Sequence, residues 1–229
     1  MTSVRKGKES RATKETNIEI EVCLDGSGEG RIDTPLPFLS HMLDQIAKHG
    51  LFELAVAAKG DVEIDGHHTT EDIGIVLGKA FAAALGDRAG IARYGWATLP
   101  MDEARATAAI DLSGRTFFVW DVAMPKARLG AWDTELAEVF FEGFARGAAC
   151  NLHIVLHAGK NLHHMTEVCF KAFAKALRAK PSKKTSASSV SHAPSLAFGI
   201  ATSQTKNVRP ERSIVAVARA SSIGSVAQP

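Results

Sequence analysis

The sequence predicts an α+β fold built by internal duplication of a β-β-α-β-α unit, with sheets backed by helices. The main observation is a repeated motif: His-His-x-Thr-Glu occurs at 67–71 and returns at 163–167, 96 residues later. Strand-like and helix-like periods follow the same order around both copies. The segment 86–90, which contains two glycines, separates the halves. We therefore expect a first repeat in residues 1–88 and a second in residues 89–178.

The first half begins with two strand-like segments, because apolar and polar residues alternate along 17–24 and 30–34. An amphipathic helical period follows over 37–48, and a third strand-like run covers 51–58. The first His-His motif then opens a second helix, whose apolar spacing extends over 72–85.

The second half repeats this order. Alternating segments at 105–112 and 116–124 predict two strands, and 133–146 has a helical period. An apolar run at 151–157 predicts the third strand, and the second motif opens a helix over 168–178. The order β-β-α-β-α thus occurs twice, as sheets backed by helices.

The composition excludes several classes of protein. Apolar residues make up 45% of the 229 residues and charged residues 23%, as in ordinary globular proteins. No apolar run approaches the ~18 residues that cross a bilayer, and residues 1–20 lack the apolar segment of a secretion signal. Cys23, Cys150 and Cys169 are far apart, which argues against a disulfide framework or a thiolate zinc site. We expect a cytoplasmic protein without a membrane partner.

Charge divides the chain unevenly. Residues 1–178 carry a net charge of −4, whereas residues 179–229 carry +6 together with 11 serines. The basic segment shows no amphipathic period, so we expect a disordered tail. A basic tail can contact nucleic acid, but this one lacks interleaved aromatic residues and any recognisable binding motif, and we expect no nucleic-acid partner.

The two motifs carry the chemistry of a metal site. In a helix, residues i and i+4 share a face, so the first histidine of each motif can meet the glutamate. The second histidine lies about 100° further round the axis, so one motif can serve two metal ions. One more imidazole comes from the helix expected before the first motif. The predicted ligands are His41, His67, His68, Glu71, His163, His164 and Glu167.

Neutral imidazole and carboxylate ligands, without thiolate, suit manganese, iron or zinc. A purely structural alternative exists, because Thr and Glu near a helix N-terminus also make capping interactions. The repetition of the motif in equivalent positions favours the metal site. Arg93 and Arg115 stand at junctions that contain glycine, where arginine forks can bind phosphate, although many surface arginines bind nothing.

Several segments in one order resemble the imidazoleglycerol-phosphate dehydratase family of histidine biosynthesis. The resemblance runs from about Arg11 to Arg178. The segments are 11–18 (RATKETNI), 41–45 (HMLDQ), 49–50 (HG), 60–72 (GDVEIDGHHTTED), 100–104 (PMDEA), 111–115 (DLSGR) and 163–167 (HHMTE).

The resemblance implies dehydration of imidazole glycerol phosphate, a small phosphorylated imidazole, to imidazole acetol phosphate at a site with two manganese ions. It also implies a homo-oligomeric shell of 24 subunits with active sites between subunits. The seven ligands named above match the family's metal ligands. By the same match, the catalytic residues are Glu15, Glu167 and Lys171, and the substrate-binding residues are Gln45, His49, Arg93, Arg115, Ser182 and Lys184.

The low acidity of the substrate proton explains why the reaction needs a metal ion. The proton to be removed is not next to a carbonyl and is therefore weakly acidic. A metal bound to the imidazole acts as Lewis acid and template, and a carboxylate such as Glu15 or Glu167 can move protons. Which group acts at which step stays open at this point.

Three departures from the family pattern stand out. Ser40 replaces an aspartate, and Val139 occupies a position that is usually a His or Glu ligand. The C-terminal Pro-Ser-[Ser/Thr]-Lys-Gly segment, which closes over the phosphate, has only a loose match around Ser182 and Lys184, so the tail is either divergent or the product of a frameshift. The departures motivate the alternative of a degenerate, non-catalytic metal-binding shell. A two-metal hydrolase is a third hypothesis, supported only by generic ligands.

Overall fold

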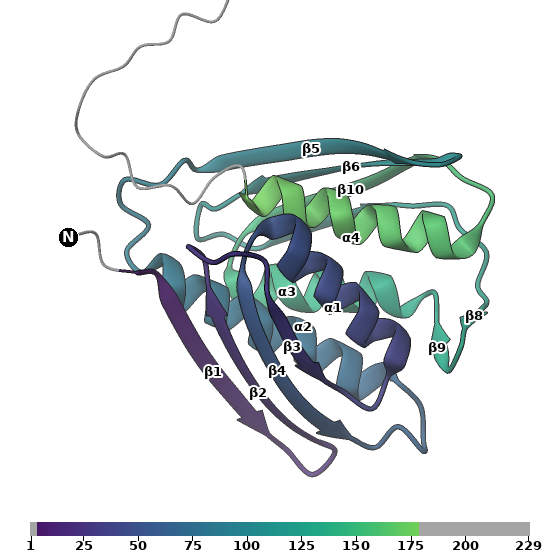
Figure 1. Ribbon diagram of the computed structural model, residues 1–229, viewed down its shortest axis with the longest axis horizontal. Helices are drawn as coiled ribbons and strands as arrows, with labels where there is room; N and C mark the ends of the chain where they lie inside the picture. The colour runs from purple at the N-terminus through teal and green to yellow at the C-terminus, as the bar shows by residue number, and fades with distance from the viewer. Residues whose placement is uncertain (1–3, 179–229) are drawn as a thin grey trace, which may run out of the picture. The chain divides into compact units, whose positions relative to one another are not determined.

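Two four-stranded sheets enclose four helices in the computed structural model, which describes residues 4–178 (Figure 1). The tail 179–229 lies outside the described residues. The first half contains β1 (Lys6–Ala12), β2 (Thr16–Cys23), β3 (Gly30–Asp33), α1 (Pro37–Gly50), β4 (Glu53–Gly60) and α2 (His67–Leu85). The second contains β5 (Tyr94–Met101), β6 (Ala104–Asp111), β7 (Phe117–Asp121), β8 (Arg128–Leu129), β9 (Trp132–Asp133), α3 (Leu136–Ala148), β10 (Asn151–Ala158) and α4 (Leu162–Arg178).

The sheet topology confirms the predicted duplication. The strand order is β1-β2-β4-β3 in the first sheet and β5-β6-β10-β7 in the second. In each sheet one pair is parallel, β3 with β4 and β7 with β10, and a helix connects its two strands. Each half carries one strand more than the predicted β-β-α-β-α unit, because β1 and β5 precede the expected elements. The short β8–β9 hairpin was also not predicted.

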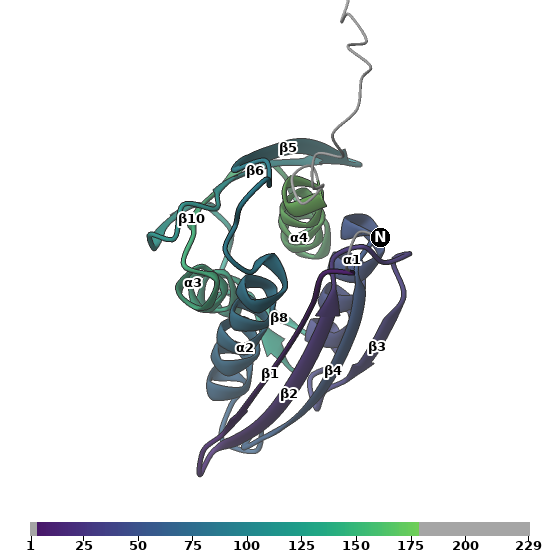
Figure 2. The ribbon, with the colours of Figure 1, turned by 90° about the vertical axis from the view of Figure 1, so that its left-hand side faces the viewer.

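The four helices form the middle layer between the two sheets (Figure 2). α1 and α2 pack against the first sheet, and α3 and α4 pack against the second. Between the halves, α1 packs against α4 and α2 packs against α3. Each helix pair therefore consists of one helix from each repeat. The two halves share one core.

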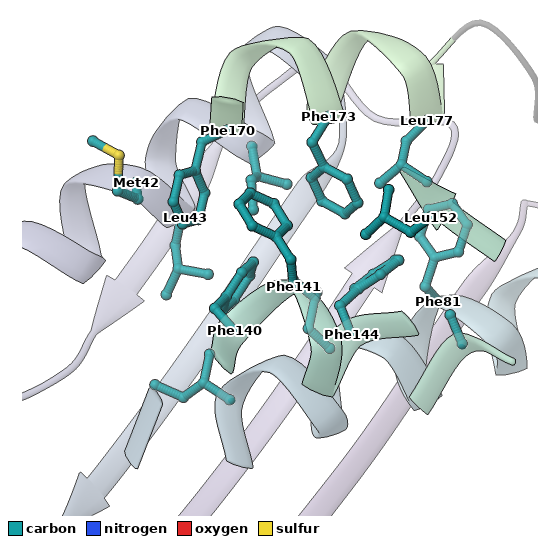
Figure 3. Packing of buried hydrophobic residues seen from close by; sticks show 14 of the residues in the cluster. Met42, Leu43, Phe81, Phe140, Phe141, Phe144, Leu152, Phe170, Phe173 and Leu177 are labelled. Atoms are coloured by element: carbon teal, nitrogen blue, oxygen red, sulfur yellow. The ribbon is translucent and has the colours of Figure 1, made fainter. Parts of the chain in front are cut away.

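Aromatic side chains fill the space between α3 and α4 (Figure 3). Phe141 lies 4.6 Å from Phe170, and Phe144 lies 4.8 Å from Phe173, measured between ring centroids. All four rings are fully buried. Each such pair adds about 0.5–1.5 kcal/mol beyond the burial of its area, so this cluster fixes how the second motif's helix sits.

Glycines let α2 and α3 approach closely. A Cβ atom at Gly74 on α2 would lie 2.4 Å from the carbonyl oxygen of Phe140, and one at Gly78 would lie 2.4 Å from that of Phe144. On α3, a Cβ atom at Gly147 would lie 2.2 Å from the carbonyl oxygen of Ile75. Because backbone atoms cannot yield as flexible side chains do, only glycine permits this contact. None of the helices in residues 4–178 is both long and apolar enough to cross a membrane.

We expect Gly74→Ala to destabilise the protein by about 1–3 kcal/mol, because the added methyl group overpacks a backbone contact. The loss should appear even though alanine is the better helix former. Urea unfolding measures it, with Ala83→Leu on the exposed face of α2 as control. A Gly74→Ala variant as stable as the unmodified chain would contradict the close approach.

Candidate active site

Side chains just before each motif start its helix. The Oδ1 atom of Asn161 accepts hydrogen bonds from the backbone N–H groups of His163 (2.9 Å) and His164 (3.3 Å). At the start of α2, Oδ1 of Asp65 accepts from the N–H of His67 at 2.7 Å. These caps satisfy N–H groups that a helix leaves without partners. The capping alternative therefore does not explain the motifs, since residues outside them carry out that role.

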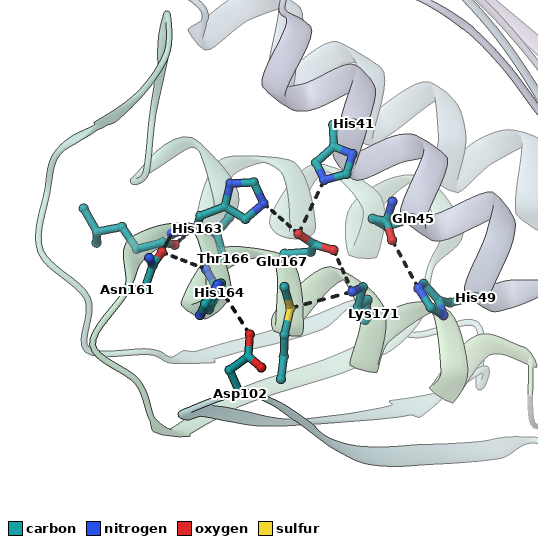
Figure 4. A network of polar contacts seen from close by, with 12 residues as sticks. His41, Gln45, His49, Asp102, Asn161, His163, His164, Thr166, Glu167 and Lys171 are labelled. Carbon is teal, nitrogen blue, oxygen red and sulfur yellow. Dashed lines mark hydrogen bonds and ion pairs between the residues drawn. The ribbon is translucent and has the colours of Figure 1, made fainter.

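One set of predicted ligands comes together where α1 meets α4 (Figure 4). The Nε2 atom of His163 lies 2.7 Å from Oε2 of Glu167, and Nε2 of His41 lies 3.4 Å from the same oxygen. One donor atom from each residue lies within 4.8 Å of the other two. Two donor atoms that bind one divalent ion at 2.0–2.2 Å lie at most about 4.4 Å apart, and both imidazole contacts to Oε2 are within that limit. The three residues fit a metal ion.

Further polar residues surround the buried carboxylate of Glu167. The Nζ atom of Lys171 lies 2.6 Å from its Oε1. Burial raises the pKa of Glu167, but hydrogen bonds from Lys171 and His163 outweigh burial and hold that pKa below its ordinary value. One turn along α1, Gln45 and His49 form a hydrogen bond of 3.1 Å. Burial, and next the positive charge of Lys171, lower the pKa of His49. These residues form one polar strip along α1 and α4.

The second histidine of each motif binds a carboxylate through Nδ1. His164 Nδ1 lies 2.8 Å from Oε2 of Glu103, and His68 Nδ1 lies 3.0 Å from Oδ2 of Asp61. Each hydrogen bond raises the pKa of its histidine. Since an ionised carboxylate only accepts, Nδ1 carries the hydrogen and Nε2 is directed away from that contact. Carboxylate–histidine pairs of this kind orient metal-ligating histidines.

Glu103 also fixes the loop before α4. It accepts hydrogen bonds from the backbone N–H groups of Asn161 (2.7 Å) and Lys160 (3.0 Å). The Asn161 N–H, followed by the His164 side chain, lowers the pKa of Glu103 to about 2. Asp61 and Glu103 lie within the segments that resemble the family, but no pattern in the sequence predicted a role for either residue. They do not occupy equivalent positions in the two repeats, so the duplication could not reveal them.

The first motif lies at the start of α2, with its members in different surroundings. His67 is exposed, and His68 faces Asp61. Glu15 lies in the β1–β2 turn, close enough for its charge to contribute to the raised pKa of His68. Glu71 forms an ion pair with Arg146 of α3. Within residues 4–178, the only group of three metal-ligating side chains is the one at α1 and α4.

An aromatic wall joins the two motifs. Trp132 Nε1 donates a hydrogen bond of 3.2 Å to Thr70 in the first motif. The Trp132 ring also packs against Phe38, whose ring lies 5.4 Å from His163. Beside these rings is a cavity of about 370 Å³, bordered by His41 and His163. This volume lies within the range of small-ligand sites.

The two predicted phosphate-binding arginines lie at the other end of the second sheet. Arg93 makes two hydrogen bonds to Asp111, of 2.5 and 2.9 Å. Arg115 lies nearby, since its carbonyl oxygen accepts from Asn151, which pairs with Asp111. The eight residues of β5 separate Arg93 from the hairpin that binds His164 by roughly 25 Å. One chain therefore does not bring Arg93 to His164 of the second motif. Ser182 and Lys184 lie outside the described residues.

The positions that depart from the family pattern have ordinary local roles. The hydroxyl of Ser40 hydrogen bonds with that of Thr34 at 2.8 Å, in the loop that leads into α1. Val139 on α3 is half-buried and packs against the core. Valine offers no atom that could bind a metal ion, and the Ser40 hydroxyl is engaged with Thr34.

Comparisons with known proteins agree on one family. A sequence profile of the family described as imidazoleglycerol-phosphate dehydratase matches residues 34–177. The imidazoleglycerol-phosphate dehydratase of Geobacter metallireducens is 53% identical over 173 residues, which cover 76% of this chain and 89% of that protein. The enzyme of Citrifermentans bemidjiense is 56% identical over 167 residues, covering 73% and 86%.

Solved structures show the same relationship. The crystal structure of imidazoleglycerol-phosphate dehydratase from Staphylococcus aureus matches with a TM-score of 0.68 and 36% identity, covering 76% of this chain and 96% of that one. The Pyrococcus furiosus enzyme, solved in complex with (S)-C348, matches with a TM-score of 0.66 and 31% identity, covering 77% and 97%. Fold and relatives together define an enzyme of the dehydratase class. The chain belongs to the imidazoleglycerol-phosphate dehydratase family, as its motifs predicted.

The Arg93–Asp111 pair predicts a pH-dependent stability. Hydrogen bonds from Arg93 hold the pKa of Asp111 below its ordinary value. A carboxyl group with a lowered folded-state pKa stabilises the folded chain above its unfolded pKa of about 3.9, and this contribution is lost as the pH falls through the folded value. Because Arg93 is exposed, we expect Asp111→Asn to cost only about 0.5 kcal/mol at pH 7.

Urea unfolding at a series of pH values checks this expectation. The difference between Asp111→Asn and the unmodified chain should shrink as the pH falls below about 4. Asp133→Asn, which breaks the exposed Arg128–Asp133 pair, is the control and should have little effect. A constant difference at all pH values would contradict the assigned pairing.

Proposed function

We propose that the chain catalyses the metal-dependent dehydration of imidazole glycerol phosphate to imidazole acetol phosphate, a step of histidine biosynthesis. Family membership supports the reaction. The observation that favours metal dependence is the convergence of His41, His163 and Glu167 at the junction of α1 and α4. Their imidazole and carboxylate donors suit manganese, with iron or zinc as alternatives. When bound, such an ion supplies Lewis-acid polarisation of the substrate.

Glu167 is suited to hold and transfer a proton. Its carboxylate is buried, and Lys171 on one oxygen and His163 on the other fix its orientation. Lys171 keeps the carboxylate ionised at neutral pH, which lets it accept a proton from a weakly acidic carbon. Glu15 is the second proposed carboxylate, near the first motif. The cavity bordered by Phe38 and Trp132 is suited to an imidazole ring, since aromatic side chains pack on its faces and edges.

We further propose that the complete site needs a second copy of the chain. Arg93 and Arg115 are the proposed phosphate ligands, but the length of β5 places Arg93 roughly 25 Å from the hairpin that binds His164 in the same chain. At the same end of the second sheet, Tyr94, Trp96 and Phe117 are exposed. Exposed apolar side chains gathered in this way are typical of interaction surfaces. Association into a homo-oligomer, as large as the 24-subunit shell that the resemblance implied, would bring arginines of one subunit to histidines of another.

The alternative is a non-catalytic metal-binding shell. Val139 and Ser40 favour this alternative, because each removes a polar group that the family pattern has at that position. The two proposals agree on metal binding and assembly, and they differ only in turnover.

Turnover separates the two proposals. We expect metal-loaded protein to convert imidazole glycerol phosphate to imidazole acetol phosphate. Liquid chromatography of the reaction mixture detects the product. Glu167→Gln removes both the proposed base and one proposed metal ligand while keeping the side chain's shape, and we expect its kcat to fall roughly 100-fold or more. Glu138→Gln on the exposed face of α3 is the matched control. Absence of turnover by fully metal-loaded, folded protein would overturn the enzymatic proposal.

Metal removal should change the size of the assembly. A metal bound only in the assembled state stabilises that state, so we expect EDTA to shrink the particle and manganese to restore it. Size-exclusion chromatography with light scattering measures the mass. An assembly whose mass never responds to EDTA would refute this coupling without touching the dehydratase proposal.

A further inference from the structure

The glutamates of the two motifs have different surroundings. Glu167 is buried, its Oε2 faces two imidazoles, and its Oε1 binds Lys171. Glu71, at the equivalent position of the first motif, is half-buried, and its Oε1 accepts a hydrogen bond from Nη2 of Arg146 on α3. Among residues 4–178, no third metal-ligating side chain completes a group around Glu71. The duplicated fold therefore holds one ligand cluster and one ion pair.

The partner that Glu71 lacks is the counterpart of His41. Because α1 packs against α4 and α3 packs against α2, the position related to His41 by the duplication lies on α3. Val139 is its approximate counterpart: Val139 precedes the second motif by 24 residues, whereas His41 precedes the first by 26. The Val139 side chain packs against the core and has no lone pair to offer a metal ion.

The close contact of α2 and α3 explains why the cation comes from α3. Lys171 reaches Glu167 from four residues further along the same helix. The residue four positions after Glu71 is Ile75, whose backbone lies directly against Gly143 and Gly147. Arg146 lies between these two glycines on α3, at the edge of the helix contact. Its guanidinium therefore reaches the carboxylate across the interface.

Resting on the ligand roles proposed above for the two motifs, we infer that Arg146 takes the place of a metal ion at Glu71. The chain then binds one divalent ion tightly, at α1 and α4, and a second only weakly, at α2 and α3. A guanidinium is permanently charged and pairs strongly with carboxylates. An ion arriving at the first motif has to displace it and finds valine where the other cluster has histidine.

Manganese titration of the full chain, after EDTA treatment and dialysis, tests this asymmetry. Isothermal titration calorimetry gives the affinity, and native mass spectrometry gives the number of ions per chain. We expect the unmodified protein to bind one manganese ion per chain tightly, as the first equivalent, and a second ion only weakly, as the second equivalent. Glu167→Gln should remove that equivalent, whereas the matched Glu71→Gln should leave it in place. Two equally tight equivalents in the unmodified protein would overturn the inference while leaving the proposed function intact.

Freeing Glu71 should strengthen the second site. We expect Arg146→Gln to raise the affinity of the second equivalent about tenfold, as loss of one competing charge-assisted hydrogen bond implies. Val139→His should raise it independently, and the double variant should exceed both. Arg128→Gln, which breaks the exposed ion pair with Asp133, is the control and should change neither equivalent.

The opposite result has a definite meaning. If Arg146→Gln weakens the second equivalent, Arg146 positions Glu71 for a metal, as Lys171 positions Glu167, and the inference is wrong. If Arg146→Gln does not fold, the Val139→His variant alone tests the inference. An unchanged affinity of Val139→His for the second manganese equivalent would also overturn it. Failure of the unmodified chain to bind any manganese would instead overturn the metal dependence of the proposed function.

Discussion

The close approach of α2 and α3 is the contact on which the arrangement of the helices depends. Side chains at Gly74, Gly78 or Gly147 would meet backbone carbonyl oxygens of the facing helix. Because α2 and α3 come from different repeats, their contact joins the halves into one unit. It also determines which residues can face each other there: Ile75 meets glycine, and Arg146 reaches Glu71. The distance between the two helix backbones thus determines which charged side chains can form an ion pair.

The exchange of helices between the repeats also explains why the ligand cluster draws on distant segments. His41 comes from the first repeat, whereas His163 and Glu167 come from the second. Neither half could form this cluster alone. The first helix of each repeat packs against the second helix of the other repeat. This arrangement produces two equivalent locations, one at α1 and α4 and one at α2 and α3. Sequence divergence at one residue of either location is then enough to separate their chemistry.

Repetition and period predicted most of the fold. The elements after β1 in the first half and after β5 in the second follow the expected order. β1 was missed because its sequence, KGKESRA, has no apolar alternation: it is an edge strand, formed by pairing with β2, and Gly7 rests against α2. In β5 the aromatic residues Tyr94 and Trp96 are exposed, which obscures the apolar alternation, and Pro100 further weakens the strand pattern. Tertiary pairing, not local preference, makes both strands.

The sequence predicted the ligands of the candidate site but not all of the contacts that they make. A motif repeated at helix starts predicts that His163 meets Glu167, because spacing of four residues places them on one face. The same rule predicts that His67 meets Glu71, yet Arg146, 75 residues away, is the partner of Glu71. Identical local patterns therefore do not fix the partners of the glutamate: Glu167 meets His163 and Lys171 of its own helix, whereas Glu71 meets Arg146 of the helix that faces it. A motif therefore specifies which ligands are available, whereas the packing of the helix that faces it specifies what they bind.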